Sequence, residues 1–209
     1  MNLIKTSFLS GIAAFIRMLT LLSLNKLLSI YVGPSGYAVI GQFQNFIQIV
    51  TSLATGGIQT GITKYTAEYH QDSSKQFAIW RSALKISACC SFIISLFVLV
   101  LNVQLANFFL KDEALSGVFI WLGLTLIPFS FNTLLVAIIN GKKEITLYFI
   151  VNVASSLLAL VITAMMAIFF GLYGALISLA TYQSFTLLVT FFYISKENWF
   201  DIKFFLGKF

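Results

Sequence analysis

Long apolar runs recur along the chain and constrain its fold more than any other feature of the sequence. Each run is at least about 18 residues long and nearly free of charge, the length that an α-helix needs to cross the hydrocarbon core of a bilayer. Charged residues make up only 10% of the chain, against about 25% in soluble proteins. We therefore predict an all-α polytopic membrane protein with six transmembrane helices, at residues 7–32, 37–63, 86–108, 116–139, 146–169 and 173–194.

The cations of the connecting segments lie almost entirely on one side of this predicted topology. Lys111 is the single Lys or Arg in the short connections VGPSG, LKDEALS and FGLYG. The other side holds Lys5, Lys64, Lys75, Arg81, Lys85, Lys142, Lys143, Lys196, Lys203 and Lys208. Because cytoplasmic loops carry an excess of Lys and Arg, we expect both termini in the cytoplasm. The net charge of +6 then reflects a basic face against anionic lipid rather than a nucleic-acid site.

Two cations, Arg17 and Lys26, lie inside the first predicted span, whereas all seven acidic residues fall in loops or the tail. A charge at the centre of a span costs roughly 3 kcal/mol, so it usually faces protein or water and marks a substrate path. We expect both cations to contact substrate, Arg17 above all, because a planar guanidinium suits phosphate. The alternatives are an ion pair with a neighbouring helix or subunit for Arg17, and a snorkelling side chain for Lys26. The two lie about 180° apart on a straight helix.

Polar residues recur at helical spacing along the second predicted span and form a stripe about 80° wide. The stripe comprises Gly41, Asn45, Gln48, Ser52, Thr55, Gln59 and Thr63. We predict that Asn45, Gln48 and Gln59 line an aqueous cavity and bind substrate. Helix packing is the alternative, because small and amide side chains also hold transmembrane helices together. Gly57 and Gly61 form a G-x-x-x-G pattern that would supply a packing surface on the opposite face.

The sequence contains little that is typical of an enzyme. His70 is the only histidine and lies in a charged loop, so a His-based metal site or triad cannot be assembled within the chain. No P-loop, G-x-S-x-G or C-x-x-C pattern occurs. We expect no enzymatic activity, no metal and no cofactor.

Several short motifs carry a resemblance to a known family. They are GPSG after the first span, the Gly56-Gly57 pair, GITKYTAEYH at 61–70, GK at 141–142 and GLYGAL at 171–176. In this order they resemble Wzx-type flippases of the multidrug/oligosaccharidyl-lipid/polysaccharide exporter superfamily, which includes the O-antigen and enterobacterial common antigen translocases. The resemblance implies the bacterial inner membrane and a substrate of undecaprenyl pyrophosphate that carries an oligosaccharide. It also implies that Arg17 and Lys26 match basic positions that meet the pyrophosphate and acidic sugars.

The family resembled has two six-span lobes around a central cavity, the MATE-like arrangement, and this chain offers one. We expect residues 1–194 to form an N-terminal lobe and residues 195–209 to form a cytoplasmic interfacial tail that leads to a second lobe. A second lobe or polysaccharide polymerase machinery would then be a partner. Two other functions stay open at this point. One is a multidrug cation exporter lobe, which would usually need an intramembrane carboxylate; the other is a truncated fragment or scaffold subunit that does not transport.

Overall fold

The computed structural model describes residues 3–197, 199 and 200, and in this part of the chain it contains helices and their connections only. The long helices are α1 (Leu3–Ala54), α3 (Ser73–Val100), α5 (Ser116–Gly141) and α6 (Ile145–Ile194), and α2 (Gln59–Glu68) is shorter. A short α4 (Asn102–Leu105), a π-helical η1 (Ala106–Leu110) and a 3-10 turn η2 (Glu113–Leu115) connect α3 to α5. The four long helices are long and apolar enough to cross a membrane.

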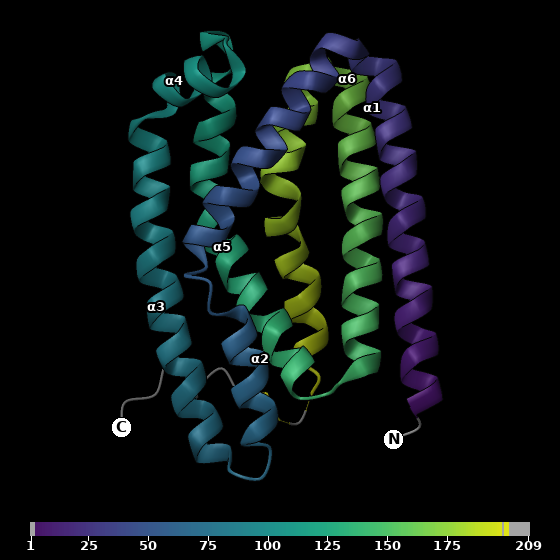
Figure 1. The fold of residues 1–209 in the computed structure, drawn as a ribbon, viewed down its shortest axis with the longest axis vertical. Helices are drawn as coiled ribbons and strands as arrows, with labels where there is room; N and C mark the ends of the chain where they lie inside the picture. Colours follow the sequence, from purple (N-terminus) through teal and green to yellow (C-terminus); the bar gives the residue numbers. More distant parts are fainter. Residues whose placement is uncertain (1–2, 198, 201–209) are drawn as a thin grey trace.

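The two longest helices are each interrupted at one glycine, where the chain turns back on itself (Figure 1). Gly33 has φ 76° and ψ 174°, and Gly171 has φ 57° and ψ −137°. Both combinations are open to glycine because it has no Cβ. The turns coincide with the predicted connections VGPSG and FGLYG, so each of these helices consists of two antiparallel halves.

The second half of α1 ends at Ala54, and a new helix begins at Gln59, so the prediction of one continuous helix over 37–63 is wrong. Gly56 and Gly57 lie between them with φ of 64° and 62°. A left-handed backbone at glycine is a common way to end a helix. The glycines of the G-x-x-x-G pattern do not pack against another helix within the described part of the chain, because a Cβ built at Gly57 or Gly61 meets no atom within 4 Å.

The main apolar core lies at the end of the molecule that holds Gly33 and Gly171. Phe119 of α5 is fully buried there and contacts Phe43 and Phe46 of α1 edge-on, with ring centroids 5.6 and 5.2 Å apart. Helix α3 packs closely along α5, and the hydroxyl of Ser95 donates to the carbonyl oxygen of Gly123 at 2.6 Å. Helix α5 is thereby the central element of the fold, contacted by α1, α2, α3 and α6.

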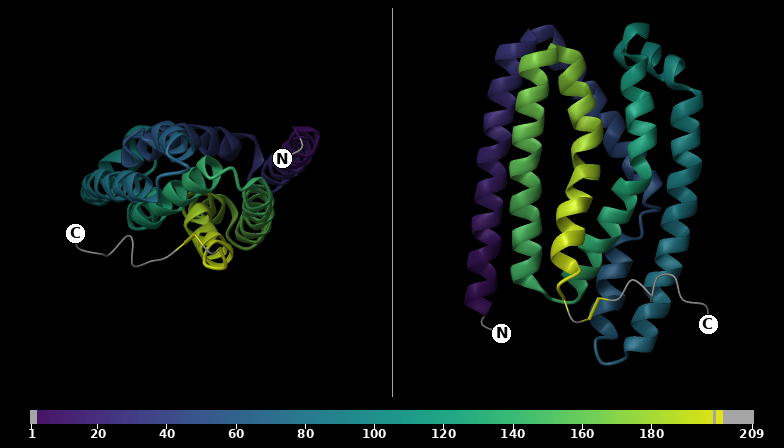
Figure 2. Two further views of the ribbon diagram at one scale, coloured as in Figure 1. Left: turned by 90° about the horizontal axis from the view of Figure 1, so that it is seen from below. Right: turned by 180° about the vertical axis from the view of Figure 1, so that it is seen from behind.

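The opposite end of the molecule holds the α2–α3 hairpin, the α5–α6 connection and the start of α1 (Figure 2). Trp80 of α3 is buried there, and its indole N–H donates to the hydroxyl of Thr66 on α2 at 2.9 Å. The ammonium group of Lys142, just after α5, lies 5.4 Å from the ring centroids of both Trp80 and Trp199. We call this the basic end, because it also carries Lys75, Lys143 and Lys196.

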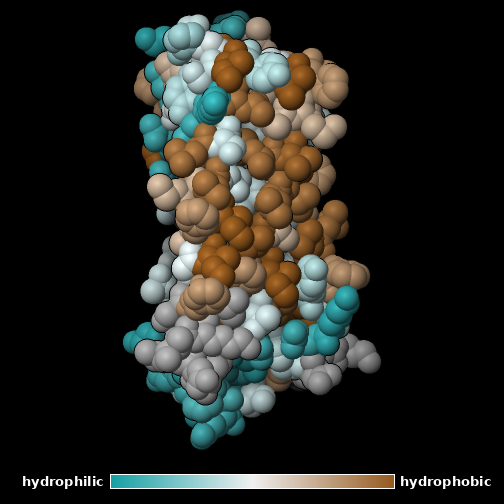
Figure 3. Space-filling model, turned by 90° about the vertical axis from the view of Figure 1, so that its right-hand side faces the viewer, coloured by the Kyte–Doolittle hydropathy of each residue, from teal (hydrophilic) through white to brown (hydrophobic). Residues whose placement is uncertain are grey.

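An apolar band covers the side of the molecule between the two ends. Figure 3 shows this band on one face, with hydrophilic residues gathered above and below it. Large apolar side chains of α1 and α6 such as Phe15 and Leu188 are exposed along it. Exposed apolar surface of this extent fits a lipid environment. The predicted tail over 195–209 lies largely outside the described residues.

Candidate functional site

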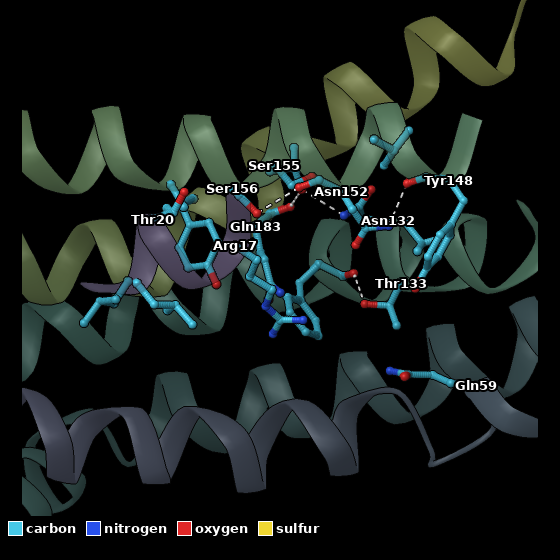
Figure 4. Close-up of a pocket in the computed structure, with 18 of the residues that line it drawn as sticks. Arg17, Thr20, Gln59, Asn132, Thr133, Tyr148, Asn152, Ser155, Ser156 and Gln183 are labelled. Carbon is cyan, nitrogen blue, oxygen red and sulfur yellow. Dashed lines mark hydrogen bonds between the residues drawn. The ribbon is translucent and has the colours of Figure 1, made fainter. Parts of the chain in front are cut away.

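A cavity of about 750 Å³ lies between the two halves of α1, α2, α5 and the two halves of α6 (Figure 4). It extends from Asn140, at the basic end of α5, to Leu28, near the end of the first half of α1. Its walls are mixed rather than apolar, because amide, hydroxyl and cationic side chains all contribute to them. Most ligand-binding pockets are concave and apolar with a few converging polar groups, so this cavity is more polar than is usual.

The cationic side of the cavity comes from α1 and α2. Arg17 lines the cavity from the first half of α1, and Lys64 lines it from α2. No acidic residue lines the cavity in the described part of the chain, and no described carboxylate lies within ion-pair distance of Arg17. The ring of Tyr182 on α6 also lines the cavity. The cavity therefore carries positive charge without a carboxylate to offset it.

The break between α1 and α2 turns the start of α2 towards the cavity. Gln59, Thr60 and Thr63 all line it, and Thr63 is held in place because its hydroxyl donates to the carbonyl oxygen of Ala137 at 3.2 Å. The first intrahelical bond runs from the Ile62 N–H to the Ile58 carbonyl, and no side chain caps the N-terminus. The N–H groups of 59–61 precede that bond, so the helix start adds donors to the cationic side.

The other side of the cavity comes from α5 and α6 and is rich in amides and hydroxyls. Its polar residues include Asn132, Thr133, Asn140, Tyr148, Asn152, Ser155, Ser156, Thr163, Tyr182, Gln183 and Thr186. The side-chain amide of Asn132 donates to the hydroxyl of Thr186 at 2.9 Å, and that of Asn152 donates to the Tyr148 carbonyl at 2.7 Å. Figure 4 shows Asn132 and Asn152 together on one side of the cavity and Gln59 across from them.

Two of the five residues predicted from the sequence to bind substrate lie on this cavity, namely Arg17 and Gln59. The structure does not bring Lys26, Asn45 and Gln48 to it, because these side chains are exposed elsewhere on α1. Lys26 lies on the far side of the helix from Arg17, as their spacing in the sequence predicts. The neighbouring Gln44 lines the cavity in place of Asn45.

The amide side of the cavity was not singled out from the sequence. Its signal was present in the spacing of Asn152, Ser155, Ser156, Ala159 and Thr163, which fall on one face of a helix. The contribution of α5 had a weaker signal, because Asn132, Thr133 and Asn140 also fall on one face of a helix but are fewer and follow Pro128. In the described residues, no three His, Cys, Asp or Glu side chains gather in a group that could hold a metal ion.

Comparison with solved structures shows the fold. The chain superposes on the crystal structure of MATE in complex with MaL6 with a TM-score of 0.70, over 88% of this chain and 44% of that chain, at 18% identity. A crystal structure of a MATE mutant gives a TM-score of 0.69 over 88% and 43%, at 17% identity. The predicted all-α, MATE-like fold is thus confirmed.

Sequence comparison shows the family. The chain is 22% identical over 144 residues to the lipid III flippases of Escherichia coli (strain K12) and Shigella flexneri, a match that covers 69% of this chain and 35% of each flippase. The chain thus spans about a third of the length of these curated relatives. The family described as polysaccharide biosynthesis protein matches residues 3–208. The resemblance noted in the sequence is therefore confirmed, and the chain belongs to the polysaccharide biosynthesis protein family.

Proposed function

We propose that the chain is a lobe of a flippase that moves undecaprenyl-pyrophosphate-linked oligosaccharide across the bacterial inner membrane for surface polysaccharide synthesis. The observation that carries the proposal is Arg17, which lines a polar cavity that holds no carboxylate among its described residues. A guanidinium without a charge partner is stabilised by an anionic ligand, and its planar fork matches two phosphate oxygens. The similarity to lipid III flippases points to the same kind of ligand.

In this proposal the two sides of the cavity contact different parts of the ligand. Arg17 meets the pyrophosphate, and Lys64 and the start of α2 lie nearer the basic end, where they attract an anionic headgroup as it enters. The amides and hydroxyls of α5 and α6 replace part of the water around the sugars, while the polyprenyl tail stays in the lipid. Lys26, Asn45 and Gln48 face away from this cavity and would contact substrate only on a surface shared with a second lobe.

We further propose that each half of α1 and of α6 crosses the bilayer once, which with α3 and α5 gives six crossings. Both ends of the described chain then lie in the cytoplasm, with the basic end against anionic lipid. A second six-helix lobe is the proposed partner that completes the cavity, because the solved MATE chains extend well beyond the region that this chain covers.

A multidrug cation exporter on the same fold is the competing function. Arg17 and Lys64 disfavour it, because a cavity with two cations and no described carboxylate repels a cationic ligand. The similarity to MATE structures does not favour it either, since at 17–18% identity that similarity concerns the fold alone.

Binding to the purified chain in lipid nanodiscs separates the two functions. Farnesyl pyrophosphate serves as the anionic probe, farnesol as its uncharged match and tetraphenylphosphonium as a lipophilic cation. We expect farnesyl pyrophosphate alone to bind, and Arg17→Gln to weaken it by about tenfold or more, because hydrogen bonds between charged groups are lost. Lys26→Gln removes one positive charge outside the cavity and should cost much less. Saturable binding of tetraphenylphosphonium with no binding of farnesyl pyrophosphate would contradict the proposal.

A further inference from the structure

We infer that the α5–α6 side of the cavity is a subsite for hydrogen-bond donors of the sugar, and that the Oδ1 atom of Asn132 determines its specificity. This inference rests on the proposed function and adds to it the residue that distinguishes a ligand with a glycan from one without. It starts from the hydrogen bonds of one buried amide.

The orientation of the Asn132 amide follows from the hydrogen bonds of Thr186. The hydroxyl of Thr186 donates its only hydrogen to the carbonyl oxygen of Gln183 at 2.6 Å. Towards Asn132, at 2.9 Å, that hydroxyl can then only accept, so the NH₂ group of Asn132 must be the side that faces it. The Oδ1 atom of Asn132 is therefore directed elsewhere, as an acceptor.

This acceptor has no donor within the described protein. Asn132 is only 7% exposed and lines the cavity, and its Oδ1 atom is itself buried and has no hydrogen-bond partner, so a donor from the cavity reaches it only when a neighbouring side chain moves. Thr163 on α6 is fully buried, lines the same cavity and has an unpartnered hydroxyl. A buried polar atom without a partner destabilises the fold, so it is rare and calls for a ligand, a water or a movement that supplies one.

Asn152 presents the same chemistry one helix away. Its NH₂ group donates to the Tyr148 carbonyl at 2.7 Å, which leaves its Oδ1 atom to accept. The α1–α2 side differs, because the guanidinium of Arg17, the ammonium of Lys64 and the free N–H groups at the start of α2 donate only. The cationic donors of the described cavity walls therefore come from α1 and α2, and the two oriented amide acceptors, the Oδ1 atoms of Asn132 and Asn152, come from α5 and α6.

A ligand that satisfies both sides needs acceptors at one part and donors at another. Pyrophosphate oxygens only accept when ionised, so they suit Arg17 and leave the acceptor of Asn132 unpaired. Sugar hydroxyls and the N–H of an acetamido group donate and match that acceptor. A site built to pair with a donor discriminates strongly against a ligand that lacks one. The structure thus assigns a glycan-bearing lipid pyrophosphate, rather than the bare lipid pyrophosphate, as the preferred ligand.

The test compares two probes on the purified chain in lipid nanodiscs, farnesyl pyrophosphate and farnesyl pyrophosphate linked to N-acetylglucosamine. Asn132→Leu keeps the size of the side chain and removes the acceptor, so it should weaken the glycosylated probe by about tenfold and leave the bare probe unchanged within about twofold. Asn107→Leu makes the same change in η1, which lies between α4 and α5 and far from the cavity. It should alter the binding of neither probe. Thr186→Val removes the group that orients Asn132 and should give a smaller loss, again for the glycosylated probe alone.

The outcomes separate this inference from the proposed function. Equal effects of Asn132→Leu on both probes, or no effect on either in a variant that unfolds at the wild-type temperature, would overturn the inference. If Asn132→Leu does not fold, the same two results for Thr186→Val decide the matter. Failure of the wild-type chain to bind either probe, or unchanged binding by Arg17→Gln, would instead overturn the proposed function.

Discussion

The ammonium group of Lys142 lies 5.4 Å from the ring centroid of Trp80 and joins the α5–α6 connection to α3. Burial lowers the pKa of Lys142 below its usual 10.5, and Glu144 partly opposes this effect by its negative charge. A lysine with a lowered pKa in the folded state loses its proton there before the unfolded chain does. Its contribution to stability therefore increases as the pH rises through the lowered pKa towards 10.5.

We accordingly expect the unfolding temperature of the wild-type chain to rise relative to that of Lys142→Gln as the pH approaches 10.5. Thermal unfolding in detergent, measured in steps from neutral pH, gives the difference. Lys143→Gln changes the adjacent lysine, for which no such interaction with Trp80 is seen, and serves as the control. A wild-type advantage that shrinks over this pH range would contradict the assignment.

The glycine break after α1 should tolerate alanine poorly. Gly57 has φ 62°, so Gly57→Ala forces a side chain into the left-handed region at a cost of about 1–2 kcal/mol, although open space surrounds the added Cβ. Gly41 lies inside helical α1 and is equally open, so Gly41→Ala should stabilise by about 0.4–1 kcal/mol. Equilibrium unfolding in detergent measures both changes in the free energy of unfolding, which should have opposite signs. Stabilisation by both substitutions would show that the segment prefers a continuous helix.

Cysteine labelling tests which positions of the second half of α1 and of α2 meet the cavity. In a chain that lacks Cys89 and Cys90, we expect Gln44→Cys and Gln59→Cys to react with a small hydrophilic thiol reagent, because both positions line the cavity. Val50→Cys is the buried control and should react poorly. Protection of Gln59→Cys alone by farnesyl pyrophosphate is the expected pattern if the ligand reaches the start of α2. Uniformly low labelling would favour helix packing for the whole segment.

The orientation in the membrane is testable at two exposed loops. Reporter fusions after His70, at the basic end, should be active only with a cytoplasmic reporter, because Lys and Arg gather on that side. Fusions after Asp112, in the connection that precedes η2, should show the reverse. A periplasmic signal at His70 would overturn the proposed orientation of the cavity.

Arg17 should be the most sensitive position of the cavity in transport. Arg17→Lys keeps the charge and loses only the two-pronged geometry, so part of the activity should remain. Arg17→Ala should lose nearly all of it, since hydrogen bonds to a charged group are worth roughly 1.5–3 kcal/mol. The measurement is surface glycan in a translocase-deficient strain that expresses a full-length protein carrying this lobe, at matched abundance in the membrane. Normal glycan from Arg17→Ala would remove Arg17 from the mechanism.

Several parts of the structure could be predicted from residue type and position alone. The turns at Gly33 and Gly171 follow from short glycine-containing connections between long apolar runs. The place of Arg17 on a polar cavity follows from the cost of a charge in the membrane without a carboxylate nearby. Both predictions depend on local composition, which the sequence states directly.

Other parts of the structure depend on where a helix is interrupted and on contacts between segments that are distant in the sequence. The stripe from Asn45 and Gln48 to Gln59 assumed one unbroken helix, and the left-handed backbone at Gly56 and Gly57 separates Gln59 from the other two. The role of Asn132 depends on Thr186, which is 54 residues away in the chain and adjacent in space. No periodic pattern in one segment reports a hydrogen bond of this kind.

The break at Gly56 and Gly57 also has a mechanical consequence. Helix α2 is fastened to α5 by the Thr63 hydrogen bond, and a Cβ at Gly141 would lie only 2.6 Å from Thr66. The second half of α1 is instead fastened to α5 by the rings of Phe43 and Phe119 at the other end. Four non-helical residues connect the second half of α1 to α2. The two helices are therefore not parts of one rigid rod. The contacts that hold α2 and those that hold the aromatic core are therefore separate along this segment.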